Sequence, residues 1–382
     1  MTDPALDAFT PDEIDRAGRY HRPLYTAGAV GTALSLAVLV LLTFTSLGNR
    51  LFGLVGGLAW WASTPLYTSL ILGISFVVGL PLAFWRGYVR EKRWGFSTQS
   101  VRGWLVDRSK GLAVGLVLTG VVFMGLIGVA RAFPRMWAVG AAGGAALLVL
   151  FLAFIAPVVL EPVFNRFRPL ADAGLAEHVR DLSVRAGVPV REVLVADASR
   201  RTKKENAYVS GLGKTRRVVV YDTLLARADP ADIGLVAAHE LGHRRLRHVF
   251  VFTVLGMAGA VVAVAALWAA VQVSSIRSAA GFGAAADPRI VPFVMLLGGA
   301  LEFVALPLQS ALSRRWEGAA DRFSLDLTQD ADLFERTHHD LAVANLIDLA
   351  PPRLVYTLLF SHPTPPQRIA MARRWRSERA TV

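Results

Sequence analysis

Six apolar runs constrain the fold of this chain more than any other feature of its sequence. Crossing a hydrocarbon core of about 30 Å takes roughly 20 helical residues. Runs of that length lie near 27–47, 66–85, 111–130, 137–160, 249–273 and 290–311. Charged residues make up only 18% of the chain, against about a quarter in soluble proteins. The sequence therefore predicts a mainly α-helical, polytopic membrane bundle of about six spans.

One further apolar segment is harder to place. The string "LFGLVGGLAWW", residues 51–61, is rich in glycine and too short to cross a bilayer. Its two tryptophans suit the level of the lipid headgroups. We therefore expect an interfacial or re-entrant segment here and not a seventh span.

Lysine and arginine fall in alternate connections between the runs. The N-terminus, the loop 86–110 and the stretch 161–248 are rich in them, while the connection after the first run has only Arg50. Basic loops mark the cytoplasmic side, so both termini and these two loops are expected there if the number of spans is even. This pattern assigns the net charge of +12 to loops beside a bilayer. We expect a lipid bilayer, and no nucleic acid, as a partner.

The segment between the fourth and fifth runs has the patterning of a small globular unit. Its apolar spacing predicts a helix over 171–188, and runs rich in β-branched residues predict strands at 191–197, 206–211 and 216–222. The expected layout is an N-terminal membrane region with four spans, a cytoplasmic α+β insert, two further spans and a C-terminal cytoplasmic part, covering in turn 1–160, 161–248, 249–311 and 312–382.

The end of the insert carries a His-Glu-x-x-His string in a helical context. Asp229 can cap a helix whose first residue is Pro230. His239 and His243, four residues apart, then lie on one face and can bind the same ion. Glu240 lies beside that ion without binding it, where it can take a proton from an attacking water. Two incidental histidines on a helix are the alternative.

A catalytic zinc site needs a third protein ligand. The string "LSRRWEGAADRF" after the sixth run offers Glu317 as that ligand, with Asp321 one turn later to orient a ligand histidine through its other ring nitrogen. Because the chain has no cysteine, thiolate ligands and nucleophiles are excluded. We expect one Zn²⁺ per chain, and the alternative is a solvated acidic pair among neighbouring arginines.

The remaining histidines show no ligand spacing. We expect five of them at the surface or the membrane interface, namely His21, His178, His248, His338 and His339. His362 differs, because it lies in the proline-rich turn "SHPTPPQRIA" ahead of a basic helix.

Several motifs in this order resemble those of a known family, the integral membrane zinc endopeptidases typified by the type-1 CAAX prenyl proteases and their bacterial relatives. The resemblance rests on "EKRWGFSTQSVRGWLVDRSKG", "APVVLEPVFNRFRPL", "NAYVSG", "RRVVVYDTLL", "SRRWEGAADRF" and "SHPTPPQRIA", and it covers most of the chain. The family's eukaryotic members have seven spans around a large intramembrane chamber, against the six counted here.

The resemblance implies roles for further residues. Asn206, with Ala207 and Tyr208 of the same motif, would lie on an edge strand that binds the substrate backbone by strand addition. His362 and Arg368 match a polar pair that faces the scissile carbonyl and stabilises its oxyanion. For Arg368, a position at the membrane surface is an equal alternative.

The predicted function is that of a zinc metalloendopeptidase acting on hydrophobic, membrane-associated or CAAX-like substrates. Its active site is expected on the cytoplasmic side, because its ligands flank the fifth and sixth runs. The composition is typical of a GC-rich bacterial genome, so the membrane is expected to be a bacterial inner membrane. A site-2-type protease would need a Leu-Asp-Gly motif, which the chain lacks. A membrane transporter or assembly scaffold with a structural or inactive metal site is the other alternative, although Glu302 alone offers an ionisable group within a run.

Overall fold

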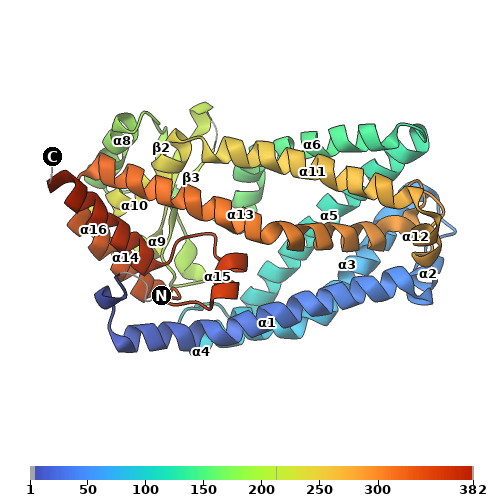
Figure 1. Cartoon of the computed structure of the whole chain (residues 1–382), viewed down its shortest axis with the longest axis horizontal. Coiled ribbons are helices and arrows are strands. Elements are labelled where there is room, and N and C mark those ends of the chain that lie inside the picture. Colours follow the sequence, from blue (N-terminus) through green and yellow to red (C-terminus); the bar gives the residue numbers. More distant parts are fainter. Residues whose placement is uncertain (1–4, 212, 381–382) are drawn as a thin grey trace.

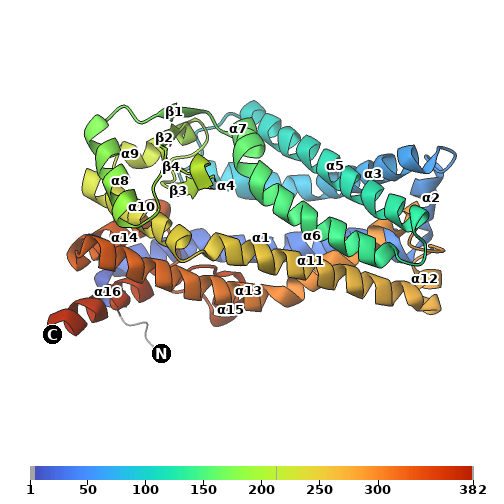
Figure 2. The same cartoon turned by 90° about the horizontal axis from the view of Figure 1, so that it is seen from above.

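Long helices running side by side form most of the molecule in a computed structural model that describes residues 5–211 and 213–380. Figure 1 shows these helices along the long axis of the molecule, with a small sheet and several shorter helices at one end. The start of α1 (Pro11–Phe44) and the helix α16 (Pro365–Ala380) lie at that same end (Figures 1 and 2).

Six helices are long and apolar enough to cross a membrane within the described part of the chain, which confirms the predicted number. They are built on α1 (Pro11–Phe44), α3 (Trp60–Phe84), α5 (Val101–Ala132), α6 (Trp137–Ile155), α11 (His248–Gln272) and α13 (Val291–Thr328). α3 and α6 each continue through a π-helical turn, into α4 (Arg90–Arg93) and α7 (Glu161–Phe164).

Two of the spans extend well beyond their apolar runs. α1 begins at Pro11, where Thr10 and Glu13 form a reciprocal capping box, because these side chains satisfy backbone N–H groups at the helix start. α13 continues past its apolar run to Thr328 and so carries polar residues out of the bundle. Between α1 and α3 lies the short helix α2 (Ser46–Gly53), and another short helix, α12 (Ser274–Ala279), follows α11.

A four-stranded sheet forms the centre of the globular end. Its strands, in the order β1-β2-β4-β3, are β1 (Phe167–Pro169), β2 (Glu192–Ala196), β4 (Arg217–Tyr221) and β3 (Ala207–Ser210). β2 and β4 are parallel and the other pairs antiparallel. The sequence predicted three of these strands but not the three-residue β1. Since β3 pairs only with β4, it is an edge strand.

Helices that precede α11 in the chain cover the sheet, and helices that follow α13 pack onto α10 (Pro230–Arg245). α8 (Ala173–Arg185) and α10 pack against the sheet around buried Val179, Val218 and Leu241. A second core joins Leu235 of α10 to Phe334 and Trp375, which come from the helices α14 (Ala331–Asn345) and α16 (Pro365–Ala380). The segments 161–248 and 312–382 therefore share one globular unit. The short helices α9 (Asp222–Leu225) and α15 (Arg353–Leu359) complete it.

The closest approach between α10 and α13 occurs at Gly242. A Cβ atom at this position would lie 3.0 Å from Cδ1 of Phe323 and 3.3 Å from the backbone of Ala320. Because backbone cannot move aside as a side-chain tip can, a side chain at this position would crowd the contact between the two helices.

Replacing Gly242 by alanine is expected to lower the thermal midpoint and the metal content of the purified protein, since overpacking costs about 1–3 kcal/mol. Gly259→Ala on α11 is the matched control, because nothing lies within 4 Å of its added Cβ, and it should keep both values. Full metal content and an unchanged midpoint for Gly242→Ala would show that the crossing tolerates a side chain. Differential scanning fluorimetry and metal analysis measure both.

Candidate metal centre

Three ligand-type side chains converge where α10 crosses α13. His239 and His243 come from α10 and Glu317 from α13, and one donor atom of each lies within 4.8 Å of the others. The Nε2 atoms of the two histidines are 3.1 Å apart. Oxygen atoms of Glu317 lie 3.2 Å from Nε2 of His239 and 3.4 Å from Nε2 of His243. The two histidines of α10 and the carboxylate of Glu317, which is distant in the sequence, thus meet at one point, as the sequence predicted.

The chemistry of these residues fits a metal ion. The side chain of Glu317 is 9% exposed, and its buried Oε2 faces Nε2 of His239 at 3.2 Å without forming a hydrogen bond within the described residues. Leaving a buried carboxylate oxygen unpaired is costly unless a cation satisfies it. Two imidazoles and a carboxylate are also the donor set of a catalytic zinc site.

Asp321 lies behind the ligands and is fully buried. Its Oδ1 is 2.8 Å from Nδ1 of His239, so it holds the ring with Nε2 toward Glu317. Nη2 of Arg368 also lies 3.4 Å from the same Nδ1, but the shorter contact assigns that proton to the bond with Asp321. Arg368 itself donates from Nε to Oδ2 of Asp321 at 2.8 Å and from Nη2 to Oδ1.

This ion pair places Arg368 inside the protein. Its side chain is 16% exposed, so the alternative position at the membrane surface is wrong. Burial disfavours its charged form, but the carboxylate of Asp321 outweighs burial and raises the pKa of Arg368. A fully buried carboxylate and a nearly buried guanidinium therefore stay charged together.

Two histidines that we expected at the surface are instead buried beside this centre. Nδ1 of His248 lies 3.0 Å from Nδ1 of His243, and its ring stacks on Trp316 at 5.3 Å. His248 is thus placed to orient His243. No sequence spacing signals this contact, because the tight turn at Arg247, with φ of 59°, brings the two rings together between α10 and α11.

His338 is the second of them. It stacks on Phe334 and its Nδ1 lies 2.9 Å from the Phe334 carbonyl, which keeps a proton on Nδ1. Burial and the positive charge of Arg368 lower the pKa of His338 to about 3, so its ring stays neutral. It faces the cavity next to the metal ligands.

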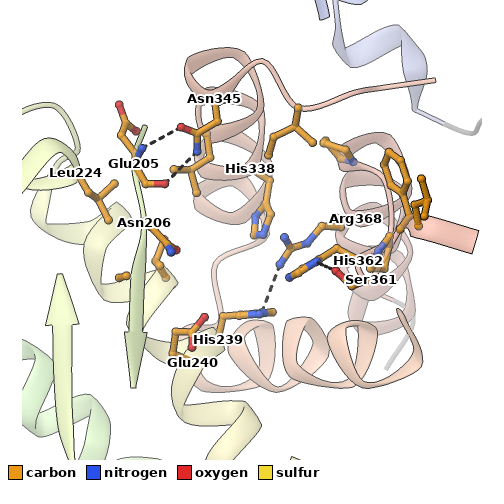
Figure 3. Close-up of a pocket in the computed structure, with 18 residues that line it drawn as sticks. Glu205, Asn206, Leu224, His239, Glu240, His338, Asn345, Ser361, His362 and Arg368 are labelled. Atoms are coloured by element: carbon orange, nitrogen blue, oxygen red, sulfur yellow. Dashed lines mark hydrogen bonds between the residues drawn. The ribbon is translucent and has the colours of Figure 1, made fainter. Parts of the chain in front are cut away.

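A cavity of 380 Å³ opens in front of the cluster. Figure 3 shows Glu240 and His239 on one wall, Asn206 on the strand side, and His362 and Arg368 across from Asn206, with Arg368 next to His239. His362 approaches the centre with Nε2 3.3 Å from Oε1 of Glu317. A bound peptide bond in this cavity would meet the carboxylate of Glu240 from one side and two nitrogen-bearing side chains from the other.

The edge strand β3 borders the same cavity. Tyr221 donates its N–H to the carbonyl of Asn206 at 3.0 Å, which fixes the register of the antiparallel ladder. Alternation along that ladder turns the backbone N–H and C=O of Glu205, Ala207 and Val209 toward the open edge. The side chain of Tyr208 points elsewhere, with Oη 3.4 Å from Oε2 of Glu161, and does not line the cavity.

Side chains already occupy the two ends of this edge. The amide of Asn345 accepts from the N–H of Glu205 at 2.9 Å and donates to its C=O at 3.1 Å, as a neighbouring strand would (Figure 3). Arg244 donates to the carbonyl of Val209 at 2.5 Å. In the described part of the chain no side chain bonds the backbone of Ala207, which lines the cavity although the residue is only 2% exposed. Sequence reasoning missed Asn345, which lies 140 residues from its partner.

Candidate spans, an HExxH helix and a buried His-His-Glu cluster define a membrane metalloprotease. Residues 169–376 match peptidase family M48, and residues 2–166 match the family described as CAAX prenyl protease N-terminal, five membrane helices. The chain belongs to peptidase family M48 and is an integral membrane metalloprotease of the CAAX prenyl protease type. Within residues 5–166, four helices are long enough to span.

Individual relatives agree with this assignment. The uncharacterised metalloprotease YhfN of Bacillus subtilis is 31% identical over 310 residues, 79% of this chain and 71% of that protein. CAAX prenyl protease 1 of Saccharomyces cerevisiae is 28% identical over 331 residues, 81% of this chain and 71% of that protein. The crystal structure of S. mikatae Ste24p has the same fold, with a TM-score of 0.84, 23% identity and coverage of 97% of this chain and 92% of that one.

Metal affinity should depend on pH through His239. Burial disfavours the charged ring, but the carboxylates of Asp321 and Glu317 outweigh burial and raise the pKa of the metal-free His239 to about 9. Below that pH a metal must displace the proton, so apparent affinity should rise by up to about tenfold per pH unit from neutral pH toward 9.

Competition with a metal-binding dye at a series of pH values measures this affinity. The comparison variant is Asp321→Asn, which removes the carboxylate that raises the pKa of His239. Its affinity should be roughly 10–100-fold lower, with a flatter pH dependence. A wild-type affinity that does not change with pH would contradict the raised pKa of His239.

Proposed function

We propose that the chain is a zinc metalloendopeptidase that cleaves hydrophobic, membrane-associated or CAAX-like substrates. The observation that carries this proposal is the position of Glu240, which lines a cavity together with His239 of the His-His-Glu cluster and the strand edge at Ala207. A metal site, a base and a peptide-binding edge are the three parts that peptide hydrolysis requires.

His239, His243 and Glu317 would hold one Zn²⁺ per chain, oriented by Asp321 and Arg368 behind His239. Zinc bound there supplies a Lewis acid that favours ionisation of water and polarises a carbonyl. The unpaired oxygen of Glu317 supports this ligand set.

Glu240 acts as the general base. It lies next to a ligand histidine on α10, accepts a proton from the attacking water and passes it to the leaving amine. His362 donates a hydrogen bond to the developing oxyanion from the opposite wall, and Arg368 adds positive charge there while remaining bonded to Asp321.

The substrate backbone pairs with β3 at Ala207. Asn345 and Arg244 leave only this part of the edge open, so a short extended segment of substrate fits beside Glu240. Such pairing recognises backbone groups and accepts many side chains. Asn206 flanks the same position from the strand side (Figure 3).

An apolar cavity supports hydrophobic substrates. It encloses 350 Å³ between α5, α6, α11 and α13 and is lined by aliphatic side chains and glycines, among them Val122, Leu148 and Leu297. The name of the yeast relative, CAAX prenyl protease 1, points to the same class. The basic residues in the loops at the globular end support a position of the active site on the cytoplasmic side, in what we propose is a bacterial inner membrane.

Glu240→Gln should abolish cleavage and keep the metal. The amide cannot accept the water's proton, so kcat should fall by about 10²–10⁴-fold, while the ligands stay in place. Cleavage of a fluorogenic peptide and metal content are measured on the same detergent-purified protein. Glu177→Gln, an exposed position on α8, controls for the loss of one carboxylate and should keep full activity. Substantial activity in Glu240→Gln would remove Glu240 from the reaction.

Ala207→Pro should weaken substrate binding without unfolding the sheet. Proline removes an N–H that faces the open edge and leaves the ladder to β4 intact, which is tolerated on edge strands. Loss of that hydrogen bond should lower kcat/KM by about tenfold, mainly through KM, with normal metal content. Ala207→Ser keeps the N–H and serves as the control. Equal kcat/KM in the two variants would place the substrate elsewhere.

A further inference from the structure

A second cavity crosses the boundary between the globular end and the membrane bundle. It encloses 890 Å³ on the other side of α10 from the catalytic cavity, and His243 forms part of its wall. Its polar end is lined by four arginines, Arg216, Arg244, Arg245 and Arg247. Its other end runs between α6 and α11, two candidate spans that pack on each other.

The arginines at the polar end carry charge that nothing in the described lining neutralises. Arg244 and Arg216 donate to backbone carbonyls, of Val209 at 2.5 Å and Gly213 at 2.9 Å, and these bonds fix their positions without an acid. Arg245 and Arg247 are exposed, and their side chains have neither a hydrogen bond nor an ion pair within the described residues. Among the described lining residues none is acidic.

The backbone holds the two free arginines at this site. Arg247 adopts φ of 59°, a left-handed conformation in the two-residue turn between the end of α10 at Arg245 and the start of α11 at His248. Arg245 packs over Gly187, whose Cβ would lie 3.7 Å from its Nε. Both guanidinium groups therefore stand where the span α11 begins, at the depth of lipid headgroups.

The opposite end of this second cavity is apolar and open. Leu150 and Phe154 of α6 face Phe250, Val254 and Met257 of α11. Phe154 is 61% exposed and Phe250 66% exposed although both lie in candidate spans. An apolar cavity with unpaired cations at one end is complementary to a lipid that has a negative headgroup and a hydrocarbon tail.

We propose that this second cavity is a binding site for an anionic phospholipid. Its phosphate is held by Arg245 and Arg247 at the cytoplasmic membrane face, and one acyl chain lies between α6 and α11. A zwitterionic lipid would leave the positive charge of Arg245 and Arg247 uncompensated, so the site discriminates by headgroup charge. Because His243 shares its wall, a bound lipid lies against the metal centre.

Lipid retention in the full-length protein tests this site. The protein is reconstituted in nanodiscs containing equal amounts of phosphatidylcholine and phosphatidylglycerol, then released and analysed by native mass spectrometry. Wild type should retain phosphatidylglycerol over phosphatidylcholine by roughly tenfold to thirtyfold. Arg245→Gln/Arg247→Gln should lose this preference, and normal metal content shows that the variant is folded.

Two further variants separate a site from general surface charge. Arg93→Gln/Arg102→Gln removes the same charge from exposed positions at the same membrane face and should keep the preference. Ala153→Trp fills the apolar end with the arginines intact and should lose retention. Equal loss in both double variants, retention in Ala153→Trp, or displacement of the lipid by glycerol phosphate or a peptide carboxylate at equal concentration would overturn the proposal.

Discussion

The crossing of α10 and α13 is the constraint on which the rest of the site depends. Gly242 lets the two helices touch, and this contact brings Glu317 and Asp321 against His239. The buried charge of Asp321 is compensated by Arg368 from α16, so a third helix is fixed to the same point. Metal ligands, their support and one wall of the cavity therefore share a single packing arrangement.

Neighbouring side chains limit the part of the β3 edge that a substrate can pair with. A long open edge would pair with any extended chain, including another copy of this protein. Asn345 and Arg244 use the edge groups of Glu205 and Val209, so that only the stretch at Ala207 beside Glu240 stays free. The same two side chains also connect β3 to α14 and α10, which keeps the edge at a constant distance from the metal centre.

Local patterns predicted some of this structure and could not predict the rest. Hydropathy gave the six spans, and the spacing of His239 and His243 placed both on one helix face, because each pattern depends on neighbouring residues only. The surface positions expected for His248 and His338 were wrong because Trp316 and Arg368, which help bury or surround them, come from distant helices. The amide of Asn345 carries no local signal at all. The shared core of 161–248 and 312–382 likewise forms only in three dimensions.

The order of the metal ligands along the chain has a mechanical consequence. His243 precedes the hairpin of α11 and α13, and Glu317 follows its membrane portion, so an ion bound by both closes a loop that enters and leaves the bilayer. A closed loop has fewer unfolded conformations than an open one, which makes the ion a removable cross-link between the membrane bundle and the globular unit. Removing the metal would then lower the stability of the protein as well as abolish its activity.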